Sequence, residues 1–365
     1  MSDSTVRIVG VEARLYAIPT PRPMVNAQRA ATVAHHVFAT VRTNQGISGT
    51  GYAFTWDAGL SRAIAALVAA LGQRLDGADP FLAGQIWRDL WGAVAFVGHQ
   101  GMSVLAIAAL DTALWDLRGK LLDTPVYRLL GGTRQEVPCY ASGWLGLHLT
   151  QEELERVASA LVEGGFRAVK MNVGRDPDED VARVRAVRRA VGDGVALLVD
   201  ANHAWRPAEA VRIGRRLEEI GIFWLEDPVH QDDLDGYAQV AAALDVPVAA
   251  GETAYTKLGI RALLERSAAD VLMPDLQRAG GITEWMKIAA LAEAWHRPVS
   301  SHVFLEPSVH LVAAATNALF LEFMARWDHV LEEPLRVREG TVRVPEAPGL
   351  GICFRESALE QYRTG

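Results

Sequence analysis

The sequence predicts an α/β fold, a (β/α)8-type TIM barrel that follows an N-terminal α+β capping domain. Eight short apolar runs between Val137 and Phe323 alternate with helical patterns. Five of these runs end in an acidic residue or a histidine, at steps of 26, 26, 23 and 27 residues: Asp200, Glu226, Glu252, Asp275 and His302. A step of about 25 residues suits one strand and one helix, and the C-terminal ends of barrel strands meet at one mouth. We therefore expect the five side chains to converge there.

The first 130 residues have a different pattern. Residues 5–55 alternate like strands around a turn signal at Asn44-Gln45-Gly46, which predicts an antiparallel meander. Residues 61–130 carry apolar side chains at helical spacing, and Gly131-Gly132 marks a boundary. We predict three regions: a capping domain (1–130), a modified TIM barrel (131–328) and a C-terminal segment that returns to the capping domain (329–365).

Within the capping domain, the segment from Pro19 to Ala34 is predicted to be a long mobile loop. It contains three prolines and joins two predicted strands. Long loops in compact domains are often lids over functional sites, so we expect this one to contribute to substrate choice. Arg22 and Arg29 are candidate partners for a distal carboxylate of a substrate, although exposed loop arginines are the simpler interpretation.

Local signals place several helices of the barrel. Thr150 followed by Glu153 is a capping box, and it opens a helix that runs to about Gly164. Helical patterns also cover residues 178–191 and 207–220, and another begins near Pro307. The intervals between these helices leave room for one strand each, as the barrel requires.

Composition narrows the class of partner and the compartment. The formal net charge is −8 and no long basic run is present, which argues against a nucleic-acid partner. No stretch of 18 apolar residues predicts a membrane span, and the N-terminal residues lack the layout of a signal peptide. The two cysteines, Cys139 and Cys353, form no C-x-x-C pair, so we expect free thiols and a cytoplasmic location.

Asp200, Glu226 and Glu252 are candidate ligands of one divalent cation. They end three consecutive strand candidates in the same phase, where crowded negative charge needs compensation. Hard cations such as Mg²⁺ take oxygen ligands, and the absence of Cys or His from the triplet argues against zinc. Helix capping or pairing with arginine is the alternative for any single acid. Three in phase favour a metal site.

Asp275 and His302 end neighbouring strand candidates and form a second group. A carboxylate beside an imidazole fixes its tautomer and raises its pKa, which makes the imidazole a better base. A purely structural His–Asp hydrogen bond is the alternative. Because both residues share the phase of the metal candidates, we expect a general base at the mouth.

Other polar residues occupy the same strands. Residues two apart in a strand share a face, so Lys170 and Asn172 point into the barrel together, and Asn202 shares a face with Asp200. An inward lysine can neutralise a substrate carboxylate or act as a base when its pKa is lowered. The structural alternative is that the lysine side chain extends to the rim of the barrel and keeps its charge in solvent. Asn172 can hydrogen-bond but cannot take a proton.

Three weaker positions and one core residue complete the set. Glu322, on the last strand, could hydrogen-bond a developing oxyanion, particularly in its protonated form. Ser142 ends the first strand, where a hydroxyl could bind a carboxylate. His203 follows Asn202 and should face differently, and His310 lies in a helical pattern and is expected in the core.

Together the motifs resemble those of the enolase superfamily and, within it, the mandelate racemase group. The resemblance covers almost the whole chain. It is carried by G-F-R-A-V-K (Gly165–Lys170), V-D-A-N (Val199–Asn202), W-L-E-D-P (Trp224–Pro228), G-E (Gly251–Glu252), M-P-D-L-Q-R-A-G-G-I-T (Met273–Thr283) and S-S-H-V-F-L-E (Ser300–Glu306), in the family order. Any one of these motifs alone would be weak, whereas the set is highly specific.

The resemblance implies a role for each matching residue. Asp200, Glu226 and Glu252 would bind Mg²⁺, and Asp275 with His302 would form the general-base dyad. Lys170 would polarise the substrate carboxylate. Glu322 would hydrogen-bond the enediolate, and Asn202 and Ser142 would contact substrate. Members of the family are commonly homo-oligomers, so a homo-oligomer is expected.

One position departs from the family pattern. Asn172 stands where mandelate racemase has the second lysine of its K-x-K pair, which is the base on the face opposite the histidine. With His302 alone, a one-base reaction remains: the imidazole removes the α-proton and then protonates a departing β-hydroxyl. We therefore expect dehydration of an acid sugar, an aldonate or aldarate, to a 2-keto-3-deoxy acid.

Two alternatives stay open. The first is a racemase, epimerase or cycloisomerase of a related carboxylic acid that uses an unusual second acid such as His203. Several aromatics near the predicted pocket would suit an apolar substituent: Phe54, Trp56, Trp144 and Trp205, together with Thr55. The second is a non-catalytic protein that has kept the barrel, for which Asn172 would be a first sign of drift.

Overall fold

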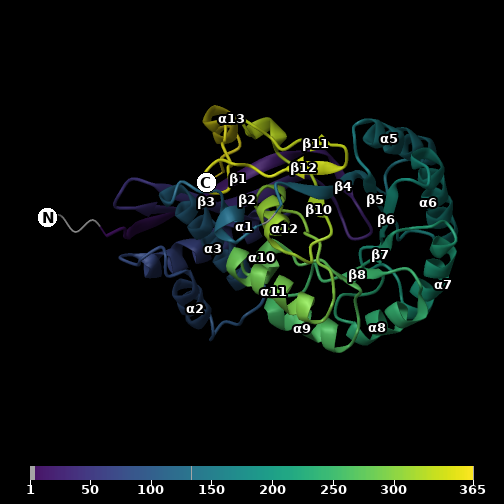
Figure 1. Ribbon diagram of the computed structural model, residues 1–365, viewed down its shortest axis with the longest axis horizontal. Coiled ribbons are helices and arrows are strands. Elements are labelled where there is room, and N and C mark those ends of the chain that lie inside the picture. Colours follow the sequence, from purple (N-terminus) through teal and green to yellow (C-terminus); the bar gives the residue numbers. More distant parts are fainter. Residues whose placement is uncertain (1–4, 133, 365) are drawn as a thin grey trace.

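The computed structural model describes residues 5–132 and 134–364, and it divides into a sheet-and-helix region and a barrel (Figure 1). The first region holds an antiparallel sheet in the order β1–β2–β3, which confirms the predicted meander. Its strands are β1 (Ile8–Val25), β2 (Ala30–Thr43) and β3 (Ser48–Thr55). The helices that follow are α1 (Ala58–Gly72), η1 (Gln73–Leu75), α2 (Ala83–Ala93), α3 (Met102–Leu121) and α4 (Val126–Leu129).

Helix α3 packs closely against β3 because two glycines leave room for it. A Cβ atom at Gly49 would lie 2.2 Å from the carbonyl oxygen of Ala113, and one at Gly51 would lie 2.2 Å from that of Ala109. The backbone N–H of Thr50 between them donates to Asp116 of α3 at 2.8 Å. Any larger residue at the two glycines would push the helix off the sheet.

The barrel is built from parallel strands in chain order from β4 to β9, with β10 paired to β4. Its strands are β4 (Glu136–Leu145), β5 (Ala168–Asn172), β6 (Ala196–Asp200), β7 (Trp224–Glu226), β8 (Val248–Ala250), β9 (Val271–Leu272) and β10 (Leu321–Phe323). The predicted seventh strand, around residues 299–302, joins its neighbours only through single bridges, at Leu272–Val299, Asp275–His302 and Val299–Ala318. The ring is closed, and the TIM barrel prediction is confirmed.

Helices surround the barrel on its outside (Figure 1). They are α5 (Gln151–Glu163), α6 (Pro177–Val191), α7 (Pro207–Glu218), α8 (Leu234–Ala243), α9 (Thr256–Glu265), α10 (Leu276–Ala279), α11 (Ile282–Ala294) and α12 (Leu305–Ala314). The capping box of Thr150 and Glu153 is present at the start of α5. Helix α7 ends two residues before the predicted Ile220, and α12 begins at Leu305 rather than near Pro307.

The interior of the barrel changes character along its axis. Alternate residues of a strand point to the same side, so on β6 and β7 the apolar Leu198 and Trp224 are followed two residues later by Asp200 and Glu226. The apolar half forms a buried cluster of Tyr140, Ala168, Leu198, Trp224, Ala249, Val271 and Met273. The polar half therefore lies on this packed apolar cluster, which we call the floor of the barrel.

The prediction of a long loop from Pro19 to Ala34 is wrong. Strand β1 continues to Val25 and β2 begins at Ala30, so most of this segment extends the hairpin, with a register shift between Pro19 and Met24. The ladder pairs Pro19 with Val33 and resumes at Met24 with Ala31 and Val25 with Ala30, so the prolines interrupt the pairing without ending it. The hairpin reaches the barrel, where the Leu147 N–H donates to Val25 at 3.0 Å.

The C-terminal segment contacts both regions. Strands β11 (Val337–Arg338) and β12 (Thr341–Arg343) pair with each other, and β12 also pairs with β4 of the barrel. The short helix η2 (Asp328–Val330) precedes these strands, and α13 (Glu356–Glu360) follows them. The last described residues return to β1, where the Thr364 N–H donates to Leu15 at 2.9 Å. The exact domain boundaries stay a prediction.

Candidate active site

A cavity of about 370 Å³ lies between the polar mouth of the barrel and the tip of the β1–β2 hairpin. Its wall includes Ser142, Lys170, Asn172, Asp200, Asn202, Glu252, His302 and Glu322 from the barrel, and Met24, Val25 and Arg29 from the hairpin. The sequence prediction that barrel strand ends and the Pro19–Ala34 segment together form one site agrees with this arrangement.

The three predicted metal ligands lie together at one point of this mouth. Asp200 and Glu226 face each other in the β6–β7 register, and Glu252 follows β8. One oxygen of each carboxylate lies within 4.8 Å of the others. Oxygens in an octahedral shell with bonds of about 2.0–2.1 Å are spaced at similar distances. The donor set and its spacing therefore fit a small divalent cation such as Mg²⁺.

Neighbouring side chains orient two of these carboxylates. The indole N–H of Trp224 donates to Glu226 at 3.0 Å, and the side-chain amide of Asn202 donates to Asp200 at 3.0 Å. Trp224 and Glu226 are two apart on β7 and share a face, whereas Asn202 lies two residues beyond the end of β6 and reaches back to Asp200. Burial is the main factor that raises the pKa of Asp200 and Glu226, and this places a large cost on leaving their charge uncompensated.

Lys170 lies between Glu322 and the three predicted metal ligands, which we call the metal triad. Its ammonium nitrogen lies 2.6 Å from Glu226, 3.0 Å from Glu322 and 3.4 Å from Asp200. Burial opposes the charge of Lys170, but the charges of Glu226 and Glu322 outweigh burial and raise its pKa well above the usual value. Lys170 is therefore a fixed cation, suited to hold an anionic substrate group and unsuited to act as a neutral base.

Glu322 is held as a carboxylate. Burial favours its protonated form, but Lys170 and His302, together with hydrogen bonds from the Ser142 hydroxyl and the Val303 N–H, outweigh burial and lower the pKa of Glu322 to about 2. An ionised carboxylate accepts hydrogen bonds and cannot donate them. The predicted donation from Glu322 to an enediolate would therefore need a proton from a neighbour such as Lys170, and it stays a prediction.

Asp275 and His302 form the predicted dyad. The Nδ1 atom of His302 lies 2.8 Å from Asp275, which also caps helix α10. The His302 side chain is only 13 % exposed, and its Nε2 atom lies 3.2 Å from Glu252. Burial disfavours the imidazolium, but Glu252 and Asp275 outweigh burial and raise the pKa of His302 well above the usual value. The metal triad and the predicted base are thus electrostatically coupled, and a cation held by Glu252 would offset its charge and favour the neutral imidazole that can take a proton.

Asn172 stands on the side of the mouth away from His302. The three strands that carry the metal triad lie between β5 and the His302 segment in one direction around the ring, and β4 with β10 lie between them in the other. The Asn172 amide donates to Asn202 at 2.8 Å. This face of the cavity therefore presents amides where a second base would stand.

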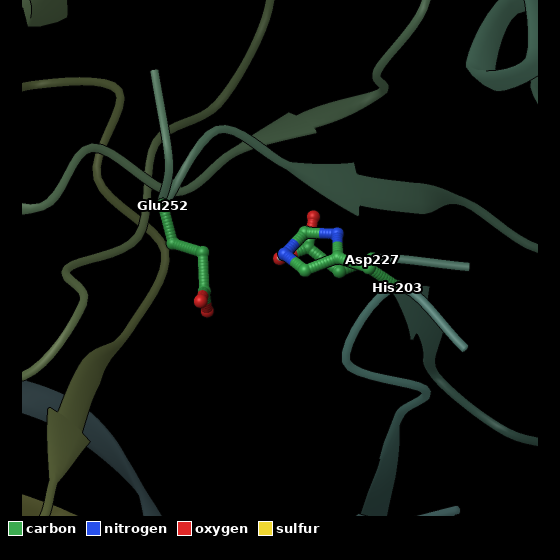
Figure 2. Close-up of side chains that lie close together, drawn as sticks. All are labelled: His203, Asp227 and Glu252. Atoms are coloured by element: carbon green, nitrogen blue, oxygen red, sulfur yellow. The ribbon is translucent and has the colours of Figure 1, made fainter. Parts of the chain in front are cut away.

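His203 does not line the cavity. It shares a second cluster with Asp227 and Glu252, in which one atom of each lies within 4.8 Å of the others (Figure 2). His203 Nε2 lies 3.4 Å from Asp227, and its Nδ1 lies 3.0 Å from both Val229 O and the Tyr237 hydroxyl. The expectation that His203 faces away from Asn202 agrees with this position, and a role as the second acid gains no support.

The cavity wall contains only some of the predicted aromatic and basic residues. Phe54, Thr55 and Trp56 line it, whereas Trp144 and Trp205 do not. Trp144 instead packs under Arg22, whose guanidinium carbon lies 4.1 Å from the ring centroid. Arg29 does line the cavity. His310 is buried between α4 and the C-terminal segment, as expected of a core residue.

Sequence reasoning missed three residues near the site. Asp227 follows Glu226 in the W-L-E-D-P motif and could have been found there. Arg278 contacts Asp275 at 3.6 Å and the Glu252 carbonyl at 3.1 Å, three residues along the short helix that Asp275 caps. Arg326 lines the cavity beyond β10 without any motif that singles it out.

Two family models cover most of the chain. Residues 10–131 match the model for the mandelate racemase / muconate lactonizing enzyme N-terminal domain, and residues 152–358 match the enolase C-terminal domain-like model. In the described part of the chain, no helix has the length and apolarity needed to cross a membrane.

Relatives of established activity align over nearly the full length. An L-talarate/galactarate dehydratase of Salmonella typhimurium is 34 % identical over 359 residues, which are 96 % of this chain and 90 % of that protein. A 3,6-anhydro-alpha-L-galactonate cycloisomerase of Streptomyces coelicolor is 35 % identical and covers 97 % of this chain and 99 % of its own. Such relatives argue against the non-catalytic alternative.

Solved structures share this fold, and two of them contain magnesium. The Salmonella typhimurium dehydratase with Mg and L-lyxarohydroxamate superposes with a TM-score of 0.95 at 33 % identity, over 100 % of this chain and 94 % of that one. A Bradyrhizobium enolase complexed with magnesium and mandelic acid gives a TM-score of 0.93 at 34 % identity, over 100 % of both chains. The expectations of this fold, an enzyme and a magnesium-dependent family are confirmed, and the chain belongs to the enolase superfamily, in its mandelate racemase / muconate lactonizing enzyme group.

Proposed function

We propose that this protein dehydrates an acid sugar to a 2-keto-3-deoxy acid, with Mg²⁺ held by Asp200, Glu226 and Glu252. The single observation that supports this choice is the asymmetry of the mouth, where an imidazole–carboxylate dyad stands opposite an asparagine. One base can serve an elimination, whereas inversion through a planar intermediate normally needs a proton carrier on each face. Relatives named as dehydratases are consistent with the proposal.

Each residue has a defined task in this reaction. The bound cation would supply charge stabilisation for the enediolate that forms when the α-proton is lost. Lys170 holds the reacting carboxylate through its fixed positive charge. His302 takes the α-proton at Nε2, while Asp275 keeps Nδ1 protonated and stabilises the resulting imidazolium.

The same imidazolium then completes the elimination. It donates its proton to the β-hydroxyl as the C–O bond breaks, and the departing group leaves as water. The enol that remains becomes the 2-keto acid, and His302 returns to its starting state. Asn172 and Asn202 contribute hydrogen bonds to the face away from His302 and exchange no proton.

The decisive experiment is a screen for 2-keto acid formation. The Mg²⁺-loaded protein would be incubated with a library of aldonates and aldarates, beside a His302→Asn variant as control. We expect one or a few acids to yield 2-keto acid with the unaltered protein and none with the variant. Equal activity of the two proteins would contradict the proposed base.

A cycloisomerase or racemase is the second candidate, because Phe54 and Trp56 line the cavity and a cycloisomerase is among the relatives. Incubation in D2O separates it from dehydration. A two-face reaction would return deuterium into recovered substrate with inverted configuration, whereas dehydration would give 2-keto acid. A cytoplasmic location and a homo-oligomeric state remain predictions alongside the proposed function.

A further inference from the structure

Arg326 is a cation of the cavity wall without an anionic partner. It lies beyond β10, and its guanidinium carbon lies 4.4 Å from the ring centroid of Phe54 and 5.2 Å from that of Trp56. Its Nε atom lies 3.1 Å from the sulfur of Met324. Its Nη1 atom is buried, and within residues 5–132 and 134–364 it has no hydrogen-bond partner.

The burial of Arg326 makes it unusual that its Nη1 atom has no hydrogen-bond partner among the residues that the structure describes. Desolvation lowers its pKa to about 10, and nearby acids such as Glu322 only partly offset that effect. Glu322 lies against Lys170 instead, at 3.0 Å. Aromatic faces offset part of the cost of a buried charge, by about 0.5–2 kcal/mol, but they do not satisfy an N–H donor. An anionic group of a ligand would both offset the buried charge and accept a hydrogen bond from the N–H donor.

Arg29 adds positive charge at the same place. It sits at the hairpin tip with its guanidinium carbon 5.8 Å from the Trp56 ring, so two arginines approach one indole. No ion pair within 4.0 Å joins either arginine to an acid among the residues that the structure describes, whereas Arg278 on the same wall pairs with Asp275. Lys170, Asp200 and Glu252 also line this cavity, and Glu226 contacts Lys170 at 2.6 Å.

We propose that the substrate is a diacid sugar, an aldarate, whose distal carboxylate binds Arg326 with support from Arg29. This inference rests on the proposed function, in which the reacting carboxylate lies beside Lys170. A terminal hydroxymethyl group, as in an aldonate, would accept one hydrogen bond and leave the charge of Arg326 uncompensated. A carboxylate matches the guanidinium in charge and in its paired donor geometry.

Binding to a protein that cannot turn over tests the proposal. In a His302→Asn background loaded with Mg²⁺, dissociation constants would be measured by calorimetry for two matched pairs, galactarate with galactonate and glucarate with gluconate. The members of a pair differ only at the terminal carbon. We expect the diacid of at least one pair to bind ten-fold or more tightly than its monoacid.

Arginine variants then locate the preference. Adding Arg326→Met should reduce the ratio within the pair to less than two-fold, Arg326→Lys should keep part of it, and Arg29→Met should have a smaller effect. Arg22→Met is the matched control, since Arg22 stacks on Trp144 outside the cavity and the ratio should not change. An unchanged thermal shift by Mg²⁺ in each variant would show that the mouth is intact.

Each outcome bears on the two proposals differently. Equal binding within both pairs, or a diacid preference that survives Arg326→Met, would overturn the diacid proposal. If the unaltered protein formed 2-keto acid from aldonates alone, dehydration would stand and the diacid proposal would fall. A preference that Arg326→Met abolishes, without 2-keto acid from any diacid, would keep the carboxylate subsite and remove dehydration. Failure of all four acids to bind would overturn the diacid proposal, and dehydration would then be decided by the 2-keto acid screen alone.

Discussion

The two halves of the barrel interior use the same strands for opposite purposes. On β6, Leu198 belongs to the buried apolar floor and Asp200 to the polar mouth; on β7, Trp224 and Glu226 divide in the same way. A separation of two residues along a strand is enough to pass from packing to chemistry. The comparison teaches that changes in the mouth should alter catalysis, whereas changes in the floor should alter stability.

The largest expected effect lies in the mouth. His302→Asn should lower kcat for the active acid sugar by about 10³-fold, because the base for the α-proton is lost. Steady-state assays of 2-keto acid would measure it, and the free energy of unfolding should stay nearly constant. A loss of less than ten-fold would remove His302 from the proton transfer.

Leu198→Ala tests the floor. The side chain is fully buried among Trp224 and its neighbours, so its truncation should lower the free energy of unfolding by about 2–5 kcal/mol. Urea titration would measure the change, and kcat per folded molecule should remain within a few fold. A variant with normal stability but lost activity would contradict the division between floor and mouth.

The sequence could predict both halves because their spacing is regular. Steps of about 25 residues located Asp200, Glu226, Glu252, Asp275 and His302, since each unit of the barrel repeats one strand and one helix. The seventh strand, near His302, was also located, although only single bridges tie it to the sheet. Its register follows from the acid at position 275, which pairs with the imidazole.

What escaped prediction lies where the chain has no period. The prolines at 19, 21 and 23 suggested a loop, but pairing with β2 overrides them. Arg326 could not be predicted, because its importance comes from the rings of Phe54 and Trp56, which belong to another domain. Contacts across domains depend on packing that no local pattern encodes.

Two histidines of the interior, His302 and His310, sharpen the comparison. His302 lies beside two carboxylates, whereas His310 accepts from the Tyr127 N–H at Nδ1 and donates from Nε2 to the Leu350 carbonyl, which fixes it as neutral. Burial lowers the pKa of His310 to about 4, below the usual 6.5. The unfolded chain therefore takes up the proton first as pH falls, and stability is lost.

This loss should be confined to one pH range. The contribution of His310 is complete above pH 6.5 and declines toward pH 4, by about 1.4 kcal/mol per pH unit and about 3 kcal/mol in all. Urea titrations at several pH values would show it as the difference in slope between the unaltered protein and His310→Gln. Parallel slopes would mean that His310 is not neutral in the fold.

The smallest effect distinguishes the two carboxylate clusters that share Glu252. Mg²⁺ at about 100 times its dissociation constant should stabilise the fold by about 2.7 kcal/mol and raise Tm by several degrees. Glu226→Gln should abolish this shift, because Glu226 belongs only to the triad with Asp200. Asp227→Asn is the matched control: it lies one residue further on and belongs only to the cluster with His203, so its shift should persist. If Asp227→Asn abolished the shift and Glu226→Gln did not, the cation would lie beside His203, away from the cavity that Lys170 and His302 line. The proposed chemistry would then lose its metal ion.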